Sequence, residues 1–514
     1  MAQILKPPST QRVYDVAVIG SQLGGAVAGA LLARRGYRVL HIDHDGVGAS
    51  YADGGYLLPY APAILFGPRQ TPAAEAALVE LGLHVDVGRL LEPSAPDLQL
   101  LLPRHRVDVP RDPQARVREL EREWPADASR LAAALSSFER LFAAANPFLK
   151  EVPPLPPESP AERRALAKAT RAGPAGPDGY ADEARPFAGL EDHPFVAALL
   201  TSQRFLSYLD GEPSPFSLNR LLGCALHGTF RMPGGYEALR ELIRRRIAES
   251  RGELLGGGDG PAAVVDAIEL DGQKAVSVRL ADHKDYFVAR AFVLATDAPA
   301  VRRILPQGEA KLAPLLEAVK PHRQLLAVNL VVKKGALPPA LGSTVVALRD
   351  PTGPDDLGNA VLLQVLPARR DTLRDARRGP GDLVPDERVV CAAGFVPADA
   401  RERGVDFLQG VGQQVLAAVA DAVPFFERHL VRKSIPALDA HERRGSRLLP
   451  HPLYQVTGEQ ALGVTGLQAR TPYKNLFFAG REVLPGLGLE GEFHAGVQAA
   501  AAVTALLGKI VGRK

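Results

Sequence analysis

The chain has 514 residues, which is enough for two or three domains with a large hydrophobic core. Its composition, 46% hydrophobic and 23% charged with a net charge of +3, is typical of a soluble globular protein. The basic residues are mixed with acids, so the sequence predicts no nucleic-acid partner. The only cysteines, Cys224 and Cys391, offer neither a disulfide framework nor a metal clip, which favours a reducing, cytoplasmic location.

The two ends of the sequence lack the signature of a membrane span. Residues 1–15 have no apolar core of a secretory signal, and no window of 18 residues is continuously apolar. The C-terminal segment 495–514 is predicted to be a buried or half-buried helix with a cationic end. Peripheral contact of that end with a membrane is a secondary alternative.

Residues 12–45 predict a strand, a glycine-rich turn, a helix and a second strand. The turn reads GSQLGG, in which Gly20 would allow a tight turn and Gly25 would let the helix pack closely on the strands. Free N–H groups at the start of such a helix attract a pyrophosphate. Asp43 ends the second strand, where an acid accepts hydrogen bonds from ribose hydroxyls. We therefore expect dinucleotide binding, the alternative being an opening that only folds in this way.

Gln22 stands where the G-x-G-x-x-G pattern has its second glycine. That glycine normally lets the backbone approach the pyrophosphate. A glutamine side chain there either points away from the phosphate or contacts it through its amide, and Gly24 beside Gly25 supplies slack. The departure predicts binding that is weaker or altered in geometry.

The next part of the chain is predicted to be helical over 70–150, where apolar residues recur at spacings of three and four. Residues 151–180 are rich in proline, alanine, glycine and arginine. This composition predicts an exposed, mobile loop or lid with one short helix at 161–170, and a plain linker is the alternative.

The next predicted elements are a Pro-Gly-Gly turn and a helix over 232–250, followed by strand-like runs between 262 and 296. Residues 306–455 mix strands with one long helix. The end of the chain, 475–503, predicts a strand, a loop and a helix.

Three of these segments together resemble the FAD-dependent amine oxidase and phytoene desaturase superfamily. They are the opening at 12–45, the run VVDAIELDGQKAVSVRLADHKDYFVARAFVLATDAPAVRRIL at 264–305, and NLFFAGREVLPGLGLEGEFHAGVQAA from residue 475. The resemblance implies an α/β protein: a Rossmann-like FAD-binding domain of three layers, with a parallel sheet and a β-meander, and an inserted α+β substrate domain. The implied domains are 1–70, 225–305 and 456–514 for FAD, and 71–224 and 306–455 for the substrate.

The same resemblance assigns residues to FAD. Val265 would contact the adenine through its backbone, Gly480 and Arg481 would lie by the pyrophosphate and ribitol, and Leu489 would approach the flavin ring. The full set of implied FAD-binding residues is Gly20, Ser21, Gln22, Gly24, Gly25, Asp43, His44, Gly48, Ala49, Ser50, Val265, Thr296, Asp297, Gly480, Arg481, Leu489, Glu490 and Gly491.

The sequence departs from the superfamily elsewhere too. Pro59 and Ala61 stand where an aspartate and a glycine are usual, although Pro62 matches. The ribose loop GVGASYADGG at 46–55 lacks the usual basic residue. These departures argue against a standard desaturase.

The resemblance implies hydride transfer between flavin N5 and a small lipophilic, isoprenoid-like substrate in a cavity between the domains. Glu490 and His494 are the candidate catalytic groups, with Glu492 beside them. The alternative is that these are first-turn helix residues whose acids favour the helix dipole. No residue cluster has metal-ligand spacing, and the oligomeric state is not predicted.

A second function stays open. The segment VLHIDHDGVGASYA at 39–52 also resembles the Rab GDP-dissociation inhibitor and escort proteins, which share this fold. That resemblance implies a cofactor-free carrier that binds prenyl groups or other lipids.

Overall fold

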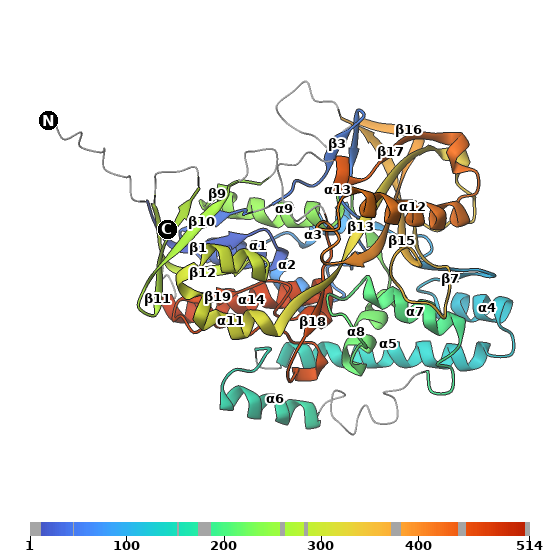
Figure 1. The fold of residues 1–514 in the computed structure, drawn as a ribbon. Coiled ribbons are helices and arrows are strands. Elements are labelled where there is room, and N and C mark those ends of the chain that lie inside the picture. Colours follow the sequence, from blue (N-terminus) through green and yellow to red (C-terminus); the bar gives the residue numbers. More distant parts are fainter. Residues whose placement is uncertain are drawn as a thin grey trace.

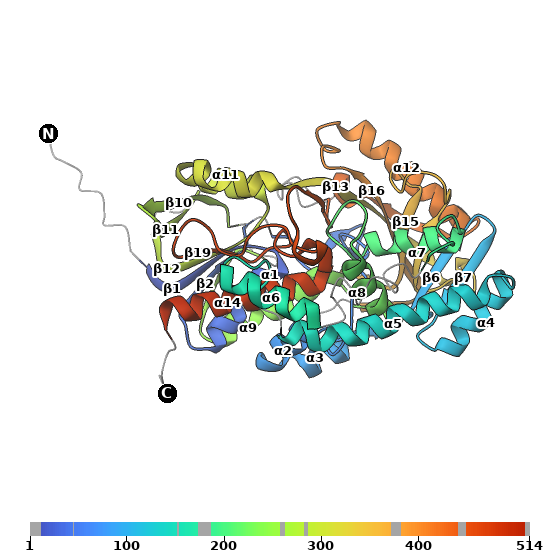
Figure 2. The same ribbon diagram turned by 90° about the horizontal axis from the view of Figure 1, so that it is seen from below.

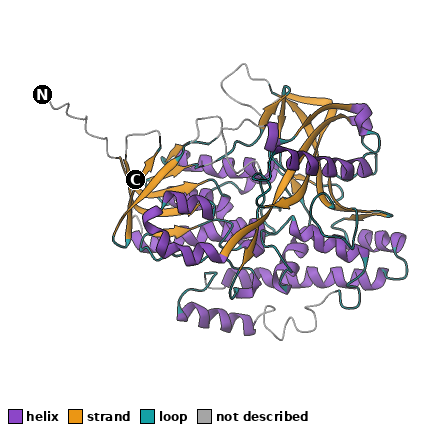
Figure 3. Ribbon diagram, in the orientation of Figure 1, coloured by secondary structure: helices purple, strands orange, loops and turns teal. Residues whose placement is uncertain are grey.

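The computed structural model describes residues 12–44, 46–151, 154–172, 187–257, 263–281, 286–371, 382–439 and 449–508. Within these ranges the chain forms two large sheets that lie side by side, with helices against both (Figure 1). Figure 3 distinguishes helices from strands and shows that each sheet has helices beside it.

The first sheet is built around β1 (Arg12–Gly20), which pairs in parallel with β12 (Tyr286–Ala295) and β2 (Val39–Ile42). β1 is buried on both faces, as expected of a central parallel strand. Val16 and Val18 face one hydrophobic cluster, and Ala17 and Ile19 face another. The other strands of this sheet are β9 (Glu253–Leu255), β10 (Val265–Asp271), β11 (Lys274–Leu280) and β19 (Leu476–Phe478).

Three helices meet on the β1 turn. α1 (Leu23–Arg34) is buried from Leu23 to Ala33 and packs against α14 (Gly488–Leu507) and α9 (Gly235–Glu249). Segments from the beginning, middle and end of the chain therefore converge at the start of α1. The two views agree in placing α1 beside α14 (Figures 1 and 2).

The second sheet is mostly antiparallel. Its strand order is β17 (Leu430–Ser434), β13 (Val319–Lys333), β16 (Asp382–Pro397), β15 (Ala360–Arg370), β14 (Thr344–Leu348), β6 (Leu98–Leu102) and β7 (His105–Val109). Along β13, alternate residues enter different cores, as the period of two in a strand requires. Leu326, Val328 and similar residues pack with α12 (Val405–Ala422), whereas Leu325 and Ala327 pack with the helices on the opposite face. Figure 2 shows α12 on one side of these strands and the helices α5 (Ala128–Glu151), α7 (Pro194–Arg204) and α8 (Pro215–Leu226) on the other.

The remaining elements have the following bounds. The helices are α2 (Pro72–Glu80), α3 (His84–Leu90), α4 (Pro113–Glu123), α6 (Pro160–Ala172), α10 (Ala298–Ile304), α11 (Glu309–Ala318) and α13 (Pro436–Asp439). The strands are β3 (Tyr51–Asp53), β4 (Tyr56–Leu58), β5 (Glu92–Pro93), β8 (Phe230–Arg231) and β18 (Leu453–Val456).

The mixed α/β architecture confirms the fold class that the sequence predicts, with a parallel sheet extended by a meander and a second, mainly antiparallel sheet. The chain boundaries of the domains stay a prediction. β3 and β4 come from the segment 1–70, which was assigned to the first domain, yet β4 pairs with β15 of the second sheet. The reason is that Tyr56 continues the edge of β15 at Arg370.

The predicted loop or lid is only partly within the described residues. α6 forms the short helix expected there, Leu166 packs into a hydrophobic core, and Glu158 and Glu162 pair with Arg470. Residues 173–180 of this segment lie outside the described residues. In the described part of the chain, no helix combines the length and apolar character needed to cross a membrane.

Candidate functional site

The turn between β1 and α1 depends on glycines that permit close backbone contacts. Gly20 has φ +122°, and a Cβ there would lie 2.0 Å from the Ala295 carbonyl oxygen. A Cβ at Gly24 would lie 2.0 Å from the Ala479 carbonyl oxygen, and one at Gly25 would lie 2.4 Å from the Ala295 Cβ. These distances are too short for a side chain, so the glycines let α1 start directly against the ends of β12 and β19.

The Gln22 side chain bonds to protein groups on the far side of this turn. Its Oε1 accepts the backbone N–H of Arg481 at 2.9 Å, and its Nε2 donates to Oε1 of Glu482 at 3.2 Å. A Cβ at Gly480 would lie 2.1 Å from Gln22 Oε1, so a glycine is needed beside the amide. The structure thus directs this amide at the segment after β19, a partner that the sequence does not predict.

Glu492 of α14 reaches the start of α1. Its Oε2 accepts the Leu23 backbone N–H at 2.9 Å and the Tyr236 hydroxyl at 2.6 Å, and its Oε1 lies 3.2 Å from Arg481 Nε. Glu492 is fully buried. A carboxylate is stabilised at this position because the helix N-terminus carries a partial positive charge. The expectation that Glu492 serves the dipole of its own helix is therefore corrected, since its carboxylate lies at the start of α1.

A second buried acid lies beside Gln22. Glu482 accepts hydrogen bonds from the Tyr454 hydroxyl at 2.9 Å and from Gln22 Nε2. Burial raises the pKa of Glu482 to about 7, and these hydrogen bonds only partly oppose that rise. The turn thus faces two buried acids, Glu492 and Glu482, and the second titrates near neutral pH.

The groups assigned to ribose and adenine also have protein partners. Asp43 Oδ1 accepts from Arg240 Nη1 at 2.9 Å, and both side chains are fully buried. Arg240 comes from α9 and donates in addition to the Val47 carbonyl oxygen at 2.8 Å. The Val265 backbone N–H donates to Nδ1 of His44 at 3.0 Å.

Two hydroxyls near the turn are buried without a hydrogen-bond partner among the described residues: Ser21 Oγ and Thr296 Oγ1. A buried hydroxyl is normally paired, so two orphaned ones beside a helix N-terminus are what a polar ligand would complete. Of the neighbouring predicted residues, Asp297 caps α10 by accepting the Ala300 N–H at 2.8 Å. Gly48, Ala49 and Ser50 form the loop that follows β2.

These observations test the fit of FAD to the region. The backbone fits, because a strand, a glycine turn, a helix start and an acid at the end of β2 occur in the order that a dinucleotide needs. The orphaned hydroxyls also fit. The side chains, however, contact one another at positions that FAD would contact, so binding requires Gln22, Glu492 and Arg240 to give up their present partners.

Glu490 and His494, the predicted catalytic residues, lie on α14 in a different environment. Arg220 of α8 donates to both carboxylate oxygens of Glu490, at 2.6 and 2.9 Å, and neither side chain is more than 1% exposed. Burial raises the pKa of Glu490, but Arg220 and His494 outweigh burial and lower it to about 2. His494 Nε2 lies 3.8 Å from Glu490 Oε1. Catalysis by either residue stays a prediction. In this structure Glu490 is engaged in a buried ion pair.

A pocket lies beside the turn network, between the second sheet and the helices α9 and α14, which pack on the first sheet, and we call it the inter-sheet pocket. Arg481 forms part of its floor, with its guanidinium carbon 5.1 Å from the Tyr208 ring centre and 4.5 Å from that of Tyr236. The pocket is lined by Val47, Tyr60, Ala61, Pro62, Ala63, Ile64, Leu65, Phe66, Phe205, Leu206, Tyr208, Gly234, Tyr236, Glu237, Leu325, Leu362, Pro450, His451, Arg481 and Leu489. Burial lowers the pKa of His451 to about 4, so this ring is neutral at pH 7.

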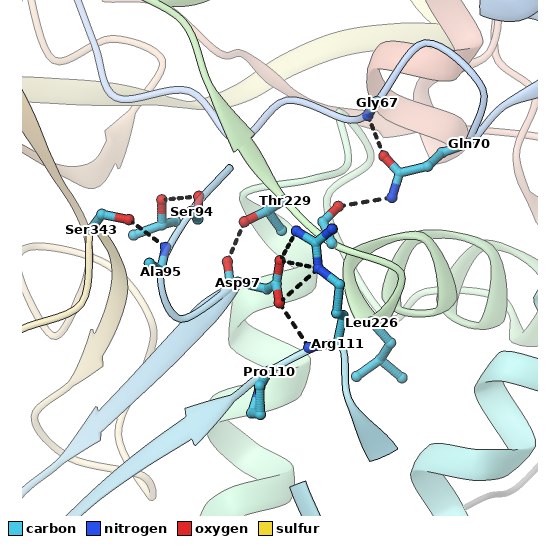
Figure 4. A network of polar contacts seen from close by, with 12 residues as sticks. Gly67, Gln70, Ser94, Ala95, Asp97, Pro110, Arg111, Leu226, Thr229 and Ser343 are labelled. Atoms are coloured by element: carbon cyan, nitrogen blue, oxygen red, sulfur yellow. Dashed lines mark hydrogen bonds and ion pairs between the residues drawn. The ribbon is translucent and has the colours of Figure 1, made fainter. Parts of the chain in front are cut away.

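One wall of the pocket, residues 61–66, is followed in the chain by Gly67 and Gln70, which belong to the polar network that Figure 4 shows. Gln70 Oε1 accepts the Gly67 N–H, and Gln70 Nε2 donates to the Gly228 carbonyl oxygen at 2.8 Å. Beside it, Asp97 accepts the Arg111 backbone N–H at 2.7 Å and pairs with Arg111 Nη2 at 2.6 Å. The network ties the pocket wall to β8 and to the edge of the second sheet.

Sequence reasoning brought together Gly20 to Gly25, Asp43 and Arg481, but it missed the residues that complete the site. Tyr236 and Arg240 come from a segment that the sequence predicts only as a helix, and Arg220 comes from a segment for which the sequence predicts no element. The local signal for Arg240 is the cluster of arginines in the helix at 235–249, which does not by itself identify the one that reaches Asp43. In the described part of the chain, no group of three or more His, Cys, Asp and Glu residues could hold a metal ion.

Comparisons with known proteins agree with this fold. A family model of the NAD(P)-binding Rossmann-like domain matches residues 18–81, and no curated protein matches the chain. An oxidoreductase from Methanosarcina mazei is similar with a TM-score of 0.56 and 12% identity, over 94% of this chain and 100% of that one. Cyclohexylamine oxidase from Brevibacterium oxydans is similar with a TM-score of 0.53 and 15% identity, over 97% and 100%. A variant of putrescine oxidase gives the same four values.

These likenesses extend over nearly the whole chain, at identities that establish the fold alone. The chain therefore shares the fold of these oxidases and of the oxidoreductase, with a Rossmann-like domain near its start, as the resemblance of its three motifs predicts.

Proposed function

We propose that this chain is an FAD-dependent oxidoreductase that acts on a small, largely apolar molecule in the inter-sheet pocket. The observation that carries the proposal is that the two parts of the site share residues. Tyr236 and Arg481 both contact the Glu492 carboxylate, which lies at the start of α1. Both residues also line the pocket. A dinucleotide held at the turn would therefore adjoin the place where a substrate binds.

The residues that would hold FAD are the ones around the turn. The backbone N–H groups of Leu23 and Arg481 would meet the pyrophosphate, and Asp43 would accept from the ribose. The hydroxyls of Ser21 and Thr296 supply further polar contacts at the same place. When bound, FAD would supply hydride transfer to or from a substrate carbon, and the protein would contribute binding, orientation and exclusion of water.

The lining of the pocket favours a lipophilic, isoprenoid-like substrate. Leucine, isoleucine, valine, phenylalanine, proline and alanine side chains make up most of its wall. The pocket has only a few polar side chains at defined positions, which is typical of a pocket that orients an apolar ligand. Because His451 is neutral, it can orient a ligand without adding a charge to this wall.

The test combines cofactor loading with a blocked pocket. The protein is incubated with FAD, and lipophilic compounds extracted from the purified protein and identified by mass spectrometry are added without oxygen. Loss of the flavin absorbance at about 450 nm reports hydride transfer. Ala61→Trp, in the pocket wall, should abolish the loss, whereas Ala76→Trp, at an exposed position of α2, should not. Equal rates in the two variants would argue against this pocket.

A second candidate function is a cofactor-free carrier of an apolar molecule. The specific observation that favours it is that Leu23, Arg481, Asp43 and Val265 already have protein partners at the groups that FAD would contact. Recovery of a bound lipid from a protein that takes up no FAD under any condition would select this function.

A further inference from the structure

We propose that Gln22, Glu492 and Arg240 act as internal substitutes for FAD: they close the dinucleotide groove in the cofactor-free protein, and FAD binds only by displacing them. FAD would then be a dissociable ligand of a protein that folds without it. This inference rests on the proposed function, because it concerns how the same site takes up its cofactor.

At the pyrophosphate position, the protein side chains match the phosphate in chemistry as well as in location. A phosphate would bring negative oxygen atoms to the N–H groups at the start of α1. Glu492 presents a carboxylate to the Leu23 N–H, and Gln22 presents an amide oxygen to the Arg481 N–H. Both donors are therefore satisfied by acceptors that belong to the chain. The carboxylate is additionally paired with the Arg481 guanidinium, so its charge is compensated without a ligand.

At the ribose position, Arg240 takes the place of the ligand. Asp43 would accept from ribose hydroxyls, and it accepts instead from Arg240, at a pair in which both side chains are fully buried. Arg240 also binds the Val47 carbonyl oxygen and Glu237, so it is anchored on the pocket side of the groove. Taken with Leu23 and Arg481, three groups at consecutive places along the groove have internal partners.

Because of these contacts, the folded state does not need bound FAD for its stability, as the folded state of a flavoprotein usually does. A buried N–H or carboxylate left without a partner costs free energy, so an empty dinucleotide groove normally weakens the folded state. Here the groups are already paired, and the cofactor-free state bears no such penalty at Leu23, Arg481 and Asp43. FAD instead has to break these contacts and overcome repulsion between its pyrophosphate and the Glu492 carboxylate.

The substitutes are side chains that can leave. Glutamate, glutamine and arginine each have several rotatable bonds, so rotation about their χ angles withdraws the head group. Arg481 lies between the leaving carboxylate and the pocket, and it would be free to pair with an incoming phosphate once Glu492 withdraws.

The experiment measures FAD affinity and thermal unfolding of the full chain, with FAD itself as the probe. Titration of flavin fluorescence compares the wild type with Glu492→Ala and with Glu492→Gln, which keeps the side-chain length but removes the charge. The matched control is Glu387→Gln in the second sheet, where a buried carboxylate also accepts from a tyrosine, Tyr56, and pairs with a cation, Lys333.

We expect the wild type to purify without flavin, to unfold cooperatively, and to bind added FAD weakly. Glu492→Ala should bind FAD more tightly by about tenfold or more, Glu492→Gln by less, and Glu387→Gln should bind as the wild type does. A wild type that retains stoichiometric FAD through purification would overturn the inference and leave the proposed function standing. Equal FAD affinity in the wild type and both Glu492 variants would also overturn it.

Failure of the proposed function has a different signature. The Glu492 variants could gain FAD affinity while their flavin is never reduced by any compound that the inter-sheet pocket binds. This result would support the proposal that Glu492 takes the place of FAD, and it would contradict the oxidoreductase activity. Cooperative unfolding of each variant shows that a change in affinity comes from the groove and not from loss of the fold.

Discussion

The Glu492 carboxylate accepts the backbone N–H of Leu23 at 2.9 Å, across a separation of 469 residues in the sequence. The Tyr236 hydroxyl donates to the same carboxylate oxygen, and the Arg481 guanidinium pairs with the other. The start of α1 is therefore joined to α9, α14 and the segment after β19 through one buried acid.

Gln22→Gly should raise the affinity for FAD and lower stability modestly. The change frees the Arg481 N–H and removes two side-chain hydrogen bonds, which together stabilise the folded state by about 1–3 kcal/mol. Flavin titration and urea unfolding of the same samples measure the two effects. Unchanged affinity would mean that the Gln22 amide does not compete with the cofactor.

Glu482→Gln should change how stability depends on pH. Burial raises the pKa of Glu482 from its ordinary value of 4.5 to about 7, so the folded state holds a proton that the unfolded state releases. The contribution of this raised pKa is present at low pH and is lost as the pH rises through about 7. Glutamine keeps an acceptor for Gln22 and Tyr454 but carries no charge.

The variant should therefore gain stability relative to the wild type, by on the order of 3 kcal/mol, between about pH 4.5 and about pH 8. Urea unfolding of both proteins across this range measures the difference. A difference that stays constant with pH would show that Glu482 is not responsible for the titration.

Arg220→Met should be strongly destabilising, because it leaves the buried Glu490 carboxylate without its partner. Breaking a buried ion pair in this way costs about 3–5 kcal/mol. Adding Glu490→Leu should restore most of the loss, since an apolar pair of similar size carries no unpaired charge. Denaturant unfolding of the single and double variants measures this; a double variant no more stable than Arg220→Met would contradict it.

Gly24→Ala should prevent α1 from packing in its present position. The added Cβ would lie 2.0 Å from the Ala479 carbonyl oxygen, a backbone atom that cannot rotate away. Gly88→Ala is the control, because Gly88 lies in α3 and a Cβ there meets nothing within 4 Å. The control should gain about 0.5–1 kcal/mol from helix propensity, whereas Gly24→Ala should unfold at a much lower temperature. Thermal unfolding of both variants distinguishes them.

The local parts of this site could be predicted from the sequence. A strand, a glycine turn and a helix are set by short-range patterns, and the close contacts of Gly20 and Gly25 follow from the same turn. The three motifs also identified which distant segments meet. The fold class follows from these motifs because a parallel sheet needs its strands to come from separate segments.

The partners of the polar groups could not be predicted in the same way. Which side chain reaches Asp43 depends on how α9 is placed along β2, and Arg240 is one of several arginines in that helix. Likewise, Glu492 is one of two acids near the start of α14, and only the packing of α14 on α1 directs it to Leu23. Such choices depend on tertiary register, which hydrophobic periodicity does not encode.

The position of β19 and α14 also bears on how the protein is made on the ribosome. β1 and α1 are synthesised before α14, which packs against α1 and begins about 450 residues after α1 ends. At about 5–20 residues per second, this delay is on the order of half a minute or longer. During that time the apolar strand and helix lack their final cover. We therefore expect nascent chains that stall before β19 to depend on chaperones and to aggregate without them.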